Sequence, residues 1–205
     1  MRAQSDERHL DLRVALNNLL DSGGKRVRPT LSLLVGNMLG AEPAPLITFA
    51  AAIEMLHTAT LVHDDLIDGS LMRRGNKTLN AKWTPAATVL TGDFIFARAA
   101  KLAAETGSLT IMEEFAETLA VIVNGELTQM FDSRGLADYD NYYQRIYAKT
   151  GSLFELSTHG AAIISPVNQT TIENARSFGR ELGTAFQIVD DILDYSATKC
   201  RICVL

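Results

Sequence analysis

Apolar residues recur at steps of three and four along most of the chain, which is the spacing of one buried face of an α-helix. The first such run begins at residue 9 and stops at the pair Gly23 and Gly24, and glycine commonly follows the end of a helix. Further helices are predicted at 28–40, 43–68, 84–106, 110–131, 140–164 and 170–195. No stretch alternates apolar and polar residues over a convincing strand length. The pattern therefore predicts one all-α domain, a bundle of long helices with some of them buried inside.

Single residues refine these helices. Pro29 suits the first turn of the second helix, where a missing N–H costs nothing. Gly125 interrupts the apolar helix at 110–131 and marks a place where another backbone packs closely. Thr170 and Glu173 have the spacing of a capping box, so we expect the last helix to begin there.

Composition and charge exclude several classes of protein. The 205 residues are 47% hydrophobic and 21% charged, as in a folded globular domain, and the net charge of −5 argues against sequence-independent nucleic-acid binding. The chain does not open with the basic, apolar and small-residue order of a signal peptide. The most apolar window, 46–62, carries Glu54 and His57 and is short for a membrane span, so it is interpreted as a buried core helix. A soluble, cytoplasmic protein is expected.

Two acidic clusters share one spacing. Carboxylates about 5 Å apart repel each other by roughly 3 kcal/mol at an effective dielectric constant of 20, so each cluster opposes folding unless a cation binds. A single cluster is most often a solvated helix end, but two identical DDxxD motifs at the ends of apolar helices favour Mg²⁺, which prefers oxygen ligands and bridges to phosphates. If the two helices face each other, six carboxylates line one cavity: Asp64, Asp65, Asp68, Asp190, Asp191 and Asp194.

Basic residues lie near the first cluster in sequence. The turn GGKRVRP places Lys25, Arg26 and Arg28 at a helix N-terminus, where backbone N–H groups also favour anions. Arg73 and Arg74 follow the first aspartates after a short loop. Each group alone could be an ordinary solvated surface. Together with the acidic clusters they indicate two phosphate-bearing ligands, one bound through metal and one bound directly by lysine and arginine.

Five motifs occur in an order that resembles the trans-isoprenyl diphosphate synthases, also called polyprenyl synthetases. They are GGKRVRP, HDDLID followed by RRG, GELTQ, KTGSLF and FQIVDDILDY, and they extend from about residue 15 to 195. The segment HTATLVHDD is most similar to that of the medium- and long-chain enzymes. The resemblance implies an all-α prenyltransferase-type bundle, usually a homodimer. It also implies Mg²⁺-dependent head-to-tail addition of isopentenyl diphosphate to an allylic prenyl diphosphate.

The resemblance also implies roles for individual residues. The first DDxxD cluster corresponds to the metal site that holds the allylic diphosphate, and the second cluster corresponds to a further Mg²⁺ site. The residues that match the isopentenyl diphosphate pocket are Lys25, Arg28, His57 and Arg74. Those that match contacts to the allylic diphosphate are Arg73, Lys149, Thr150 and Gln187, with Gln129 in the same cleft. The implied catalytic set is Asp64, Asp65, Asp68, Arg73, Lys149 and Asp190.

Product length is expected to depend on the helix that carries the first cluster. The growing prenyl chain would run from Asp64 toward the N-terminal end of that helix and meet Ala59 and Thr60 about one turn away. In the family bulky aromatic residues at these places stop growth early, so these small side chains imply products longer than farnesyl diphosphate. Phe94, Phe96 or Met55 are alternative floors of the channel.

Alternative interpretations remain at this level. Glu54 and His57 form an ExxH pair, but a di-iron bundle needs a second such pair, and the sequence contains none. A class I terpene cyclase would carry a mixed metal motif in place of the second DDxxD. A third alternative is an incomplete or non-catalytic copy or subunit that folds and dimerises without turnover.

The end of the chain favours that third alternative. Family members continue beyond the second aspartate motif, so 1–205 is interpreted as a single, truncated polyprenyl synthetase domain that lacks the C-terminal part of the family fold. Residues 196–205 form an atypical tail, in which Cys200 and Cys203 could supply only two zinc ligands.

Overall fold

The structure is a computed structural model. It describes residues 10–21, 23–131 and 139–196. The expectations for Cys200, Cys203 and most of the atypical tail lie outside these ranges.

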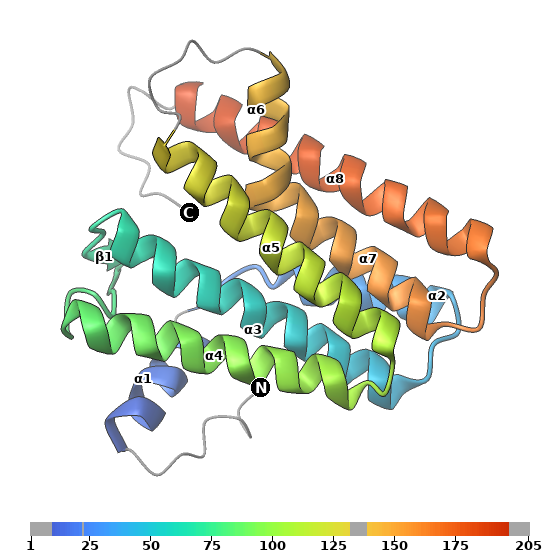
Figure 1. Cartoon of the computed structure of the whole chain (residues 1–205), viewed down its shortest axis with the longest axis horizontal. Coiled ribbons are helices and arrows are strands. Elements are labelled where there is room, and N and C mark those ends of the chain that lie inside the picture. Colours follow the sequence, from blue (N-terminus) through green and yellow to red (C-terminus); the bar gives the residue numbers. More distant parts are fainter. Residues whose placement is uncertain (1–9, 22, 132–138, 197–205) are drawn as a thin grey trace.

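Helices make up almost all of the described structure (Figure 1). In chain order they are α1 (Leu10–Asp21), α2 (Val27–Met38), α3 (Pro43–Ile67), α4 (Pro85–Glu105), α5 (Leu109–Phe131), α6 (Tyr139–Ile146), the π-helical turn η2 (Tyr147–Gly151), α7 (Ser152–Ile164) and α8 (Gln169–Ser196). Between α3 and α4 lies a small antiparallel hairpin, β1 (Met72–Arg73) and β2 (Asn76–Lys77). The all-α fold predicted from the apolar periodicity is confirmed.

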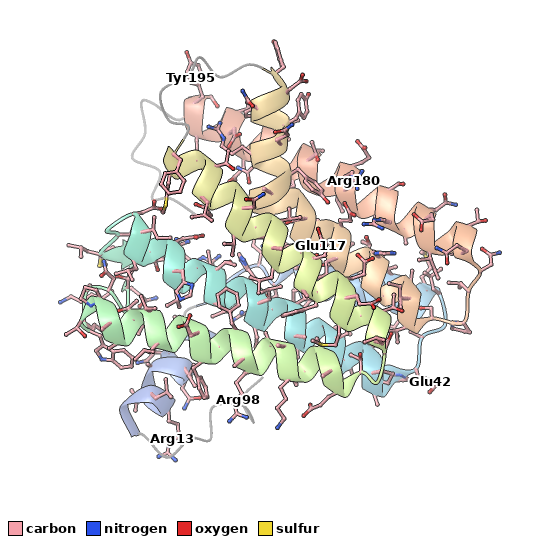
Figure 2. The ribbon with its side chains drawn as sticks, in the orientation of Figure 1. Arg13, Glu42, Arg98, Glu117, Arg180 and Tyr195 are labelled. Carbon is pink, nitrogen blue, oxygen red and sulfur yellow. The ribbon has the colours of Figure 1, made fainter. Side chains whose placement is uncertain are left out.

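Helix α3 lies at the centre of the bundle and packs against α2, α4 and α7 (Figure 1). Its side chains Phe49, Ala52, Ile53 and Leu56 have no exposed surface, because neighbouring helices cover most of its circumference. Charged residues such as Glu42 before α3 and Glu117 on α5 are exposed, and Glu42 lies at the rim of the bundle (Figure 2). The interpretation of 46–62 as part of a core helix is supported.

By length and composition, α3 could nevertheless cross a membrane, and it is the one helix in the described residues that could. This differs from the expectation that the apolar window 46–62 is too short, because the helix Pro43–Ile67 is longer than that window. The protein itself buries 61% of the most apolar stretch of α3, as is usual for the central helix of a helical bundle.

The predicted helix at 140–164 is interrupted. A π-helical turn separates α6 from α7, and it contains Lys149 and Thr150. Apolar periodicity continues through this region, so the sequence pattern could not reveal one turn of different hydrogen bonding. The interruption matters because π-helical turns are frequent at functional sites.

The last helix begins differently from the prediction. Asn168, and not Thr170, caps α8: its Oδ1 accepts a hydrogen bond from the backbone N of Thr171 at 2.9 Å. Glu173 does not close a capping box and instead accepts a hydrogen bond from the side chain of Gln169. Asparagine is as good a cap as threonine, so the helix starts one residue earlier with the alternative capping residue.

Glycines allow close helix packing at two places. A Cβ on Gly125 of α5 would lie 2.5 Å from the Cβ of Ala148, which confirms the predicted close approach. Helix α8 packs on α7 through Gly179 and Gly183, and a Cβ on Gly183 would lie 2.8 Å from the backbone Cα of Gly151. Because the contact of Gly183 is to a backbone atom of Gly151, the position of α8 relative to η2 and α7 depends on small residues.

Candidate active site

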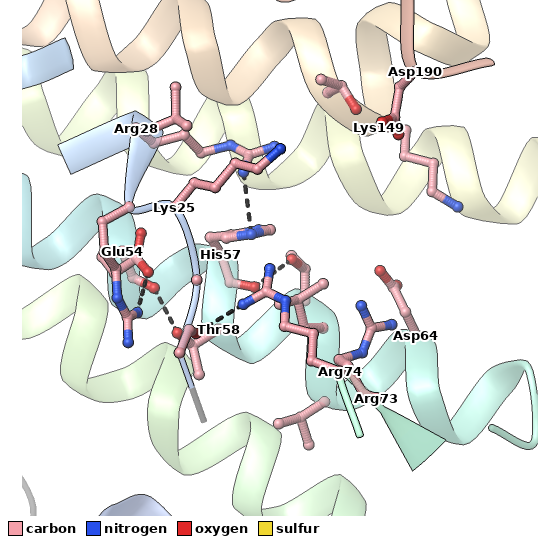
Figure 3. Close-up of a pocket in the computed structure, with 18 of the residues that line it drawn as sticks. Lys25, Arg28, Glu54, His57, Thr58, Asp64, Arg73, Arg74, Lys149 and Asp190 are labelled. Carbon is pink, nitrogen blue, oxygen red and sulfur yellow. Dashed lines mark hydrogen bonds and ion pairs between the residues drawn. The ribbon is translucent and has the colours of Figure 1, made fainter. Parts of the chain in front are cut away.

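A cavity of about 510 Å³ opens among the turn before α2, the C-terminal half of α3, the hairpin, η2 and α8 (Figure 3). Most of the predicted site residues line it, although they come from five separate segments of the chain. These residues are Lys25, Arg28, His57, Asp64, Asp65, Arg73, Arg74, Lys149, Thr150, Gln187 and Asp190.

Four predicted residues are not on the cavity wall. Asp68 follows the last turn of α3, where its backbone N donates to the carbonyl of Asp64, and its side chain is exposed. Gln129 and Asp194 are exposed on α5 and α8. Asp191 is turned toward Tyr142 and Gln187. The structure thus brings three of the six carboxylates, Asp64, Asp65 and Asp190, onto one cavity.

The turn before α2 has an unusual backbone. Gly23, Gly24 and Arg26 all have positive φ angles, of 81°, 141° and 50°. The Nη1 atom of Arg74 donates to the carbonyl of Gly23 at 2.8 Å, and a Cβ on Gly24 would lie 2.6 Å from that Nη1. Glycine at these positions therefore allows the basic hairpin to close on the turn.

Arg26 in this turn pairs with the buried carboxylate of Glu54 on α3 (Figure 3). The ion pair ties the turn to the central helix, and the negative charge of Glu54 also acts on Arg28. As part of the ExxH pair, Glu54 was an alternative metal ligand, but in this structure its carboxylate is paired with Arg26. Its signal in the sequence was a glutamate inside the most apolar window, which needs a partner when buried.

Arg28 and His57 form the inner wall of the cationic side. Nη1 of Arg28 lies 3.1 Å from Nε2 of His57, and its guanidinium lies 5.1 Å from the ring centroid of Phe154. Burial lowers the pKa of Arg28 to about 10, against the opposing charge of Glu54. Its Nε atom is buried without a hydrogen-bond partner in the described structure. A buried cation with a free donor is suited to an anionic ligand.

His57 is surrounded by positive charge. Burial, and then four nearby cations, lower its pKa well below the usual value; the cations are Arg28, Arg74, Arg73 and Arg26. The ring is therefore neutral at physiological pH, with one nitrogen as donor and the other as acceptor.

We expect the His57→Gln variant to lose less stability than the parent protein between about pH 7 and pH 5. The unfolded chain protonates His57 near pH 6.5 while the folded chain does not, so the unfolded state binds more protons and stability falls as the pH drops. Urea unfolding of parent and variant at pH 7 and pH 5 measures this, with His63→Gln on the same helix as the matched control. Identical losses in parent and His57→Gln would contradict the prediction.

The cations near the acidic side of the cavity do not offset the burial of its carboxylates. Burial, followed by the charge of Glu126, raises the pKa of Asp64 to about 6, although Lys149 and Arg73 oppose the shift. Burial and the neighbouring aspartates Asp194 and Asp191 also raise the pKa of Asp190. Burial raises the pKa of Asp65 as well, although Arg73 opposes the shift through its Nε, which donates to Oδ1 of Asp65 at 2.8 Å.

These properties fit a divalent cation. The carboxylate oxygens are hard ligands of the kind that Mg²⁺ prefers. Burial first, and then neighbouring carboxylates, raise the pKa values of Asp64 and Asp190, so an added cation would stabilise both charges. Within the described ranges no three acidic, histidine or cysteine side chains converge closely enough to enclose a metal by themselves. A metal bound here would therefore complete its coordination with water or with a bound anion.

A chain of polar contacts connects η2 with α8. The hydroxyl of Thr150 donates to Oε1 of Gln187 at 2.6 Å, and Nε2 of Gln187 donates to Oδ1 of Asp191 at 2.8 Å. The hydroxyl of Tyr142 donates to the other oxygen of Asp191 at 2.7 Å. Lys149 lies beside Asp190, across the cavity from Asp64 and Arg73 (Figure 3).

Comparison with known proteins gives the same assignment over almost the entire chain. The Polyprenyl synthetase family model matches residues 10–202. The octaprenyl diphosphate synthase of Haemophilus influenzae is 43% identical over 180 residues, which cover 87% of this chain and 55% of that protein. The octaprenyl diphosphate synthase of Escherichia coli is 42% identical over 180 residues, 87% of this chain and 56% of that protein. The chain thus spans about half the length of the curated relatives it matches.

Solved structures agree with these sequence matches. A decaprenyl diphosphate synthase from Rhodobacter capsulatus superposes with a TM-score of 0.92 at 36% identity, over 98% of this chain and 62% of that one. A polyprenyl synthase from Caulobacter crescentus, complexed with calcium and isoprenyl diphosphate, gives a TM-score of 0.90 at 37% identity, over 95% of this chain and 60% of that one. The motifs, the helical fold and these matches together place this chain in the polyprenyl synthetase family.

Proposed function

We propose that this chain provides the Mg²⁺-dependent, head-to-tail condensation of isopentenyl diphosphate with an allylic prenyl diphosphate, giving a longer all-trans polyprenyl diphosphate. The observation that carries the proposal is one cavity with buried, undercompensated carboxylates on one side and a group of cations on the other. Two diphosphates need two such environments, one through metal and one through direct contact.

The acidic side is assigned to the allylic diphosphate. Asp64, Asp65 and Asp68 on and just beyond α3, and Asp190, Asp191 and Asp194 on α8, are the proposed Mg²⁺ ligands. Bound Mg²⁺ would stabilise the negative charge that develops on the departing diphosphate. The protein groups proposed to orient that diphosphate are Arg73, Lys149, Thr150, Gln187 and Gln129.

The cationic side is assigned to isopentenyl diphosphate. Lys25, Arg28 and Arg74 would bind its diphosphate by charge, and neutral His57 would contribute one N–H donor. Departure of the allylic diphosphate leaves a carbocation, which the double bond of isopentenyl diphosphate attacks. Phe154 and Phe186, whose ring centroids lie 5.2 Å apart on the cavity wall, exclude water from that cation. The proposed acceptor of the final proton is the released diphosphate.

The second candidate is an incomplete or non-catalytic copy of such a synthase. The observation in its favour is the length of the match, about half of each curated relative. A homodimer in the cytoplasm is proposed for either candidate, in line with the family resemblance.

Incubation of the full chain with farnesyl diphosphate, isopentenyl diphosphate and Mg²⁺ separates these candidates. Formation of a longer prenyl diphosphate supports an enzyme. Binding of both substrates to folded protein without product favours the non-catalytic copy. Absence of Mg²⁺-dependent diphosphate binding would contradict both assignments.

The two residues expected to limit product length, Ala59 and Thr60, have different environments. Thr60 lines the cavity, whereas Ala59 is fully buried in the core and does not line it. Phenylalanine at position 59 would overpack the core, so Thr60 is the better position for a test. We expect Thr60→Phe to shorten the products of an active chain, because an aromatic ring there narrows the path along α3. Chromatography of the reaction products measures this, and an unchanged product ladder would contradict the proposed path.

A further inference from the structure

We propose that Glu155 is a positioning residue that fixes the π-helical turn η2, and thereby holds Lys149 and Thr150 toward the acidic side of the cavity. The inference rests on the proposed function, since it concerns groups assigned to the allylic diphosphate. Glu155 has no place in the proposed chemistry and does not line the cavity.

Glu155 lies on α7 with only 4% of its surface exposed, and three side chains donate to its carboxylate. Arg176 Nε donates to Oε1 at 2.7 Å, and Arg180 Nε donates to Oε2 at 2.8 Å, both from α8. The hydroxyl of Tyr147 donates to Oε2 at 2.9 Å. Burial alone would raise the pKa of Glu155, but these hydrogen bonds outweigh it and hold the pKa below its usual value. The carboxylate is therefore ionised, and both of its oxygens accept hydrogen bonds.

Tyr147 connects this carboxylate to η2, because it is the first residue of the turn. The guanidinium of Arg180 also lies 5.3 Å from the centroid of the Tyr147 ring. At the other end of η2, a Cβ on Gly151 would lie 3.0 Å from Cδ2 of that ring, so the tyrosine lies against the last residue of the turn. Glu155 and Arg180 thus hold the ring that packs over η2.

Two other residues of the turn, Lys149 and Thr150, reach the cavity. Thr150 donates to Gln187, which in turn donates to Asp191. A π-helical turn has one more residue than an α-helical turn, so it shifts the direction of the side chains that follow. Without a fixed partner at Tyr147, this turn could relax toward regular α-helix and rotate Lys149 and Thr150 relative to α8.

A purely structural role for Glu155 would be to tie α7 to α8 through the two arginines. That role does not require the tyrosine hydroxyl. Tyr147→Phe removes only the hydroxyl and keeps both the arginine contacts and the ring that faces Arg180, so it separates positioning from helix packing.

The test compares Tyr147→Phe with Tyr143→Phe, which makes the same chemical change on α6, outside the contacts of Glu155. Binding of inorganic pyrophosphate in the presence of Mg²⁺ is measured by calorimetry, together with thermal unfolding and hydrogen exchange of residues 147–151. Loss of one hydrogen bond to a charged acceptor is expected to weaken binding about three- to ten-fold in Tyr147→Phe. Exchange at 147–151 is expected to be faster, with the melting temperature within about 4 °C of the parent. Glu155→Gln is expected to weaken binding further and also to lower the melting temperature.

Parent-like binding and parent-like exchange in Tyr147→Phe would overturn the inference, as would equal losses in both tyrosine variants. If the unmodified chain fails to bind pyrophosphate with Mg²⁺, the proposed function itself is refuted, so the two failures are distinguishable.

Discussion

Replacement of Asp64 or Asp190 with alanine is expected to abolish the enhancement of diphosphate binding by Mg²⁺. Each residue places a carboxylate on the cavity wall, one from α3 and one from α8. Loss of a direct ligand should cost at least the roughly 10- to 100-fold that loss of an outer partner costs at metal sites. Calorimetric titration of pyrophosphate into the parent and each variant, with and without Mg²⁺, measures the effect.

The matched control is Asp140→Ala, which removes an exposed aspartate of α6 away from the cavity. The enhancement by Mg²⁺ should be unchanged in this variant. Equal affinity of the parent for pyrophosphate with and without Mg²⁺ would refute the proposed metal sites.

The Asp64 variant should also be at least as stable as the parent when metal is absent. The raised pKa of Asp64, about 6, means that its negative charge is less favourable in the folded chain than in the unfolded chain. Folding therefore takes up a proton between about pH 4 and pH 6, and the charge destabilises the folded protein above that range. Loss of Mg²⁺ enhancement in a stable variant would exclude misfolding as its cause.

Substitution of Gly179 or Gly183 with alanine is expected to be strongly destabilising. On Gly179 the added Cβ would lie 2.7 Å from the carbonyl oxygen of Phe154 and 2.9 Å from Cα of Glu155. On Gly183 it would lie 2.8 Å from Cα of Gly151. Backbone atoms cannot move aside as side-chain ends do, so α8 must shift away from η2 and α7. Overpacking of this kind costs about 1–3 kcal/mol per site, in spite of the roughly 1 kcal/mol that alanine contributes through higher helix propensity.

Urea unfolding of each glycine variant measures this loss, and Glu181→Ala is the control because it lies on the exposed side of the same helix. That control should change stability by less than about 0.5 kcal/mol. The glycine variants should also bind pyrophosphate and Mg²⁺ more weakly, since α8 carries Gln187 and Asp190 into the cavity. A Gly183→Ala variant as stable as the parent would show that the contact between the helices is not close.

Helix positions were predictable from the sequence because apolar periodicity is a local property. The range 43–68 predicted for the central helix agrees with the observed Pro43–Ile67, and 84–106 agrees with Pro85–Glu105. The predicted cap of the last helix was wrong because two nearby residues can both cap it, and Asn168 does so in place of Thr170. The π-helical turn at Tyr147–Gly151 was missed because the spacing of apolar residues continues through it while the backbone hydrogen bonding changes.

The all-α class, the two DDxxD motifs and the basic segments were predictable from the sequence, because each depends on residue types at short spacing. Which of these residues meet depends on how segments far apart in the chain pack together. The packing of the helices places Asp64, Asp65 and Asp190 on one cavity and leaves four predicted residues outside its wall: Asp68, Gln129, Asp191 and Asp194. The ends and rotations of α3, α5 and α8 fix the directions of these side chains. The ion-pair partners of the buried carboxylates Glu54 and Glu155 also depend on this packing. Arg26 lies 28 residues before Glu54, and Arg180 lies 25 residues after Glu155, so these ion pairs form only when packing brings distant segments together.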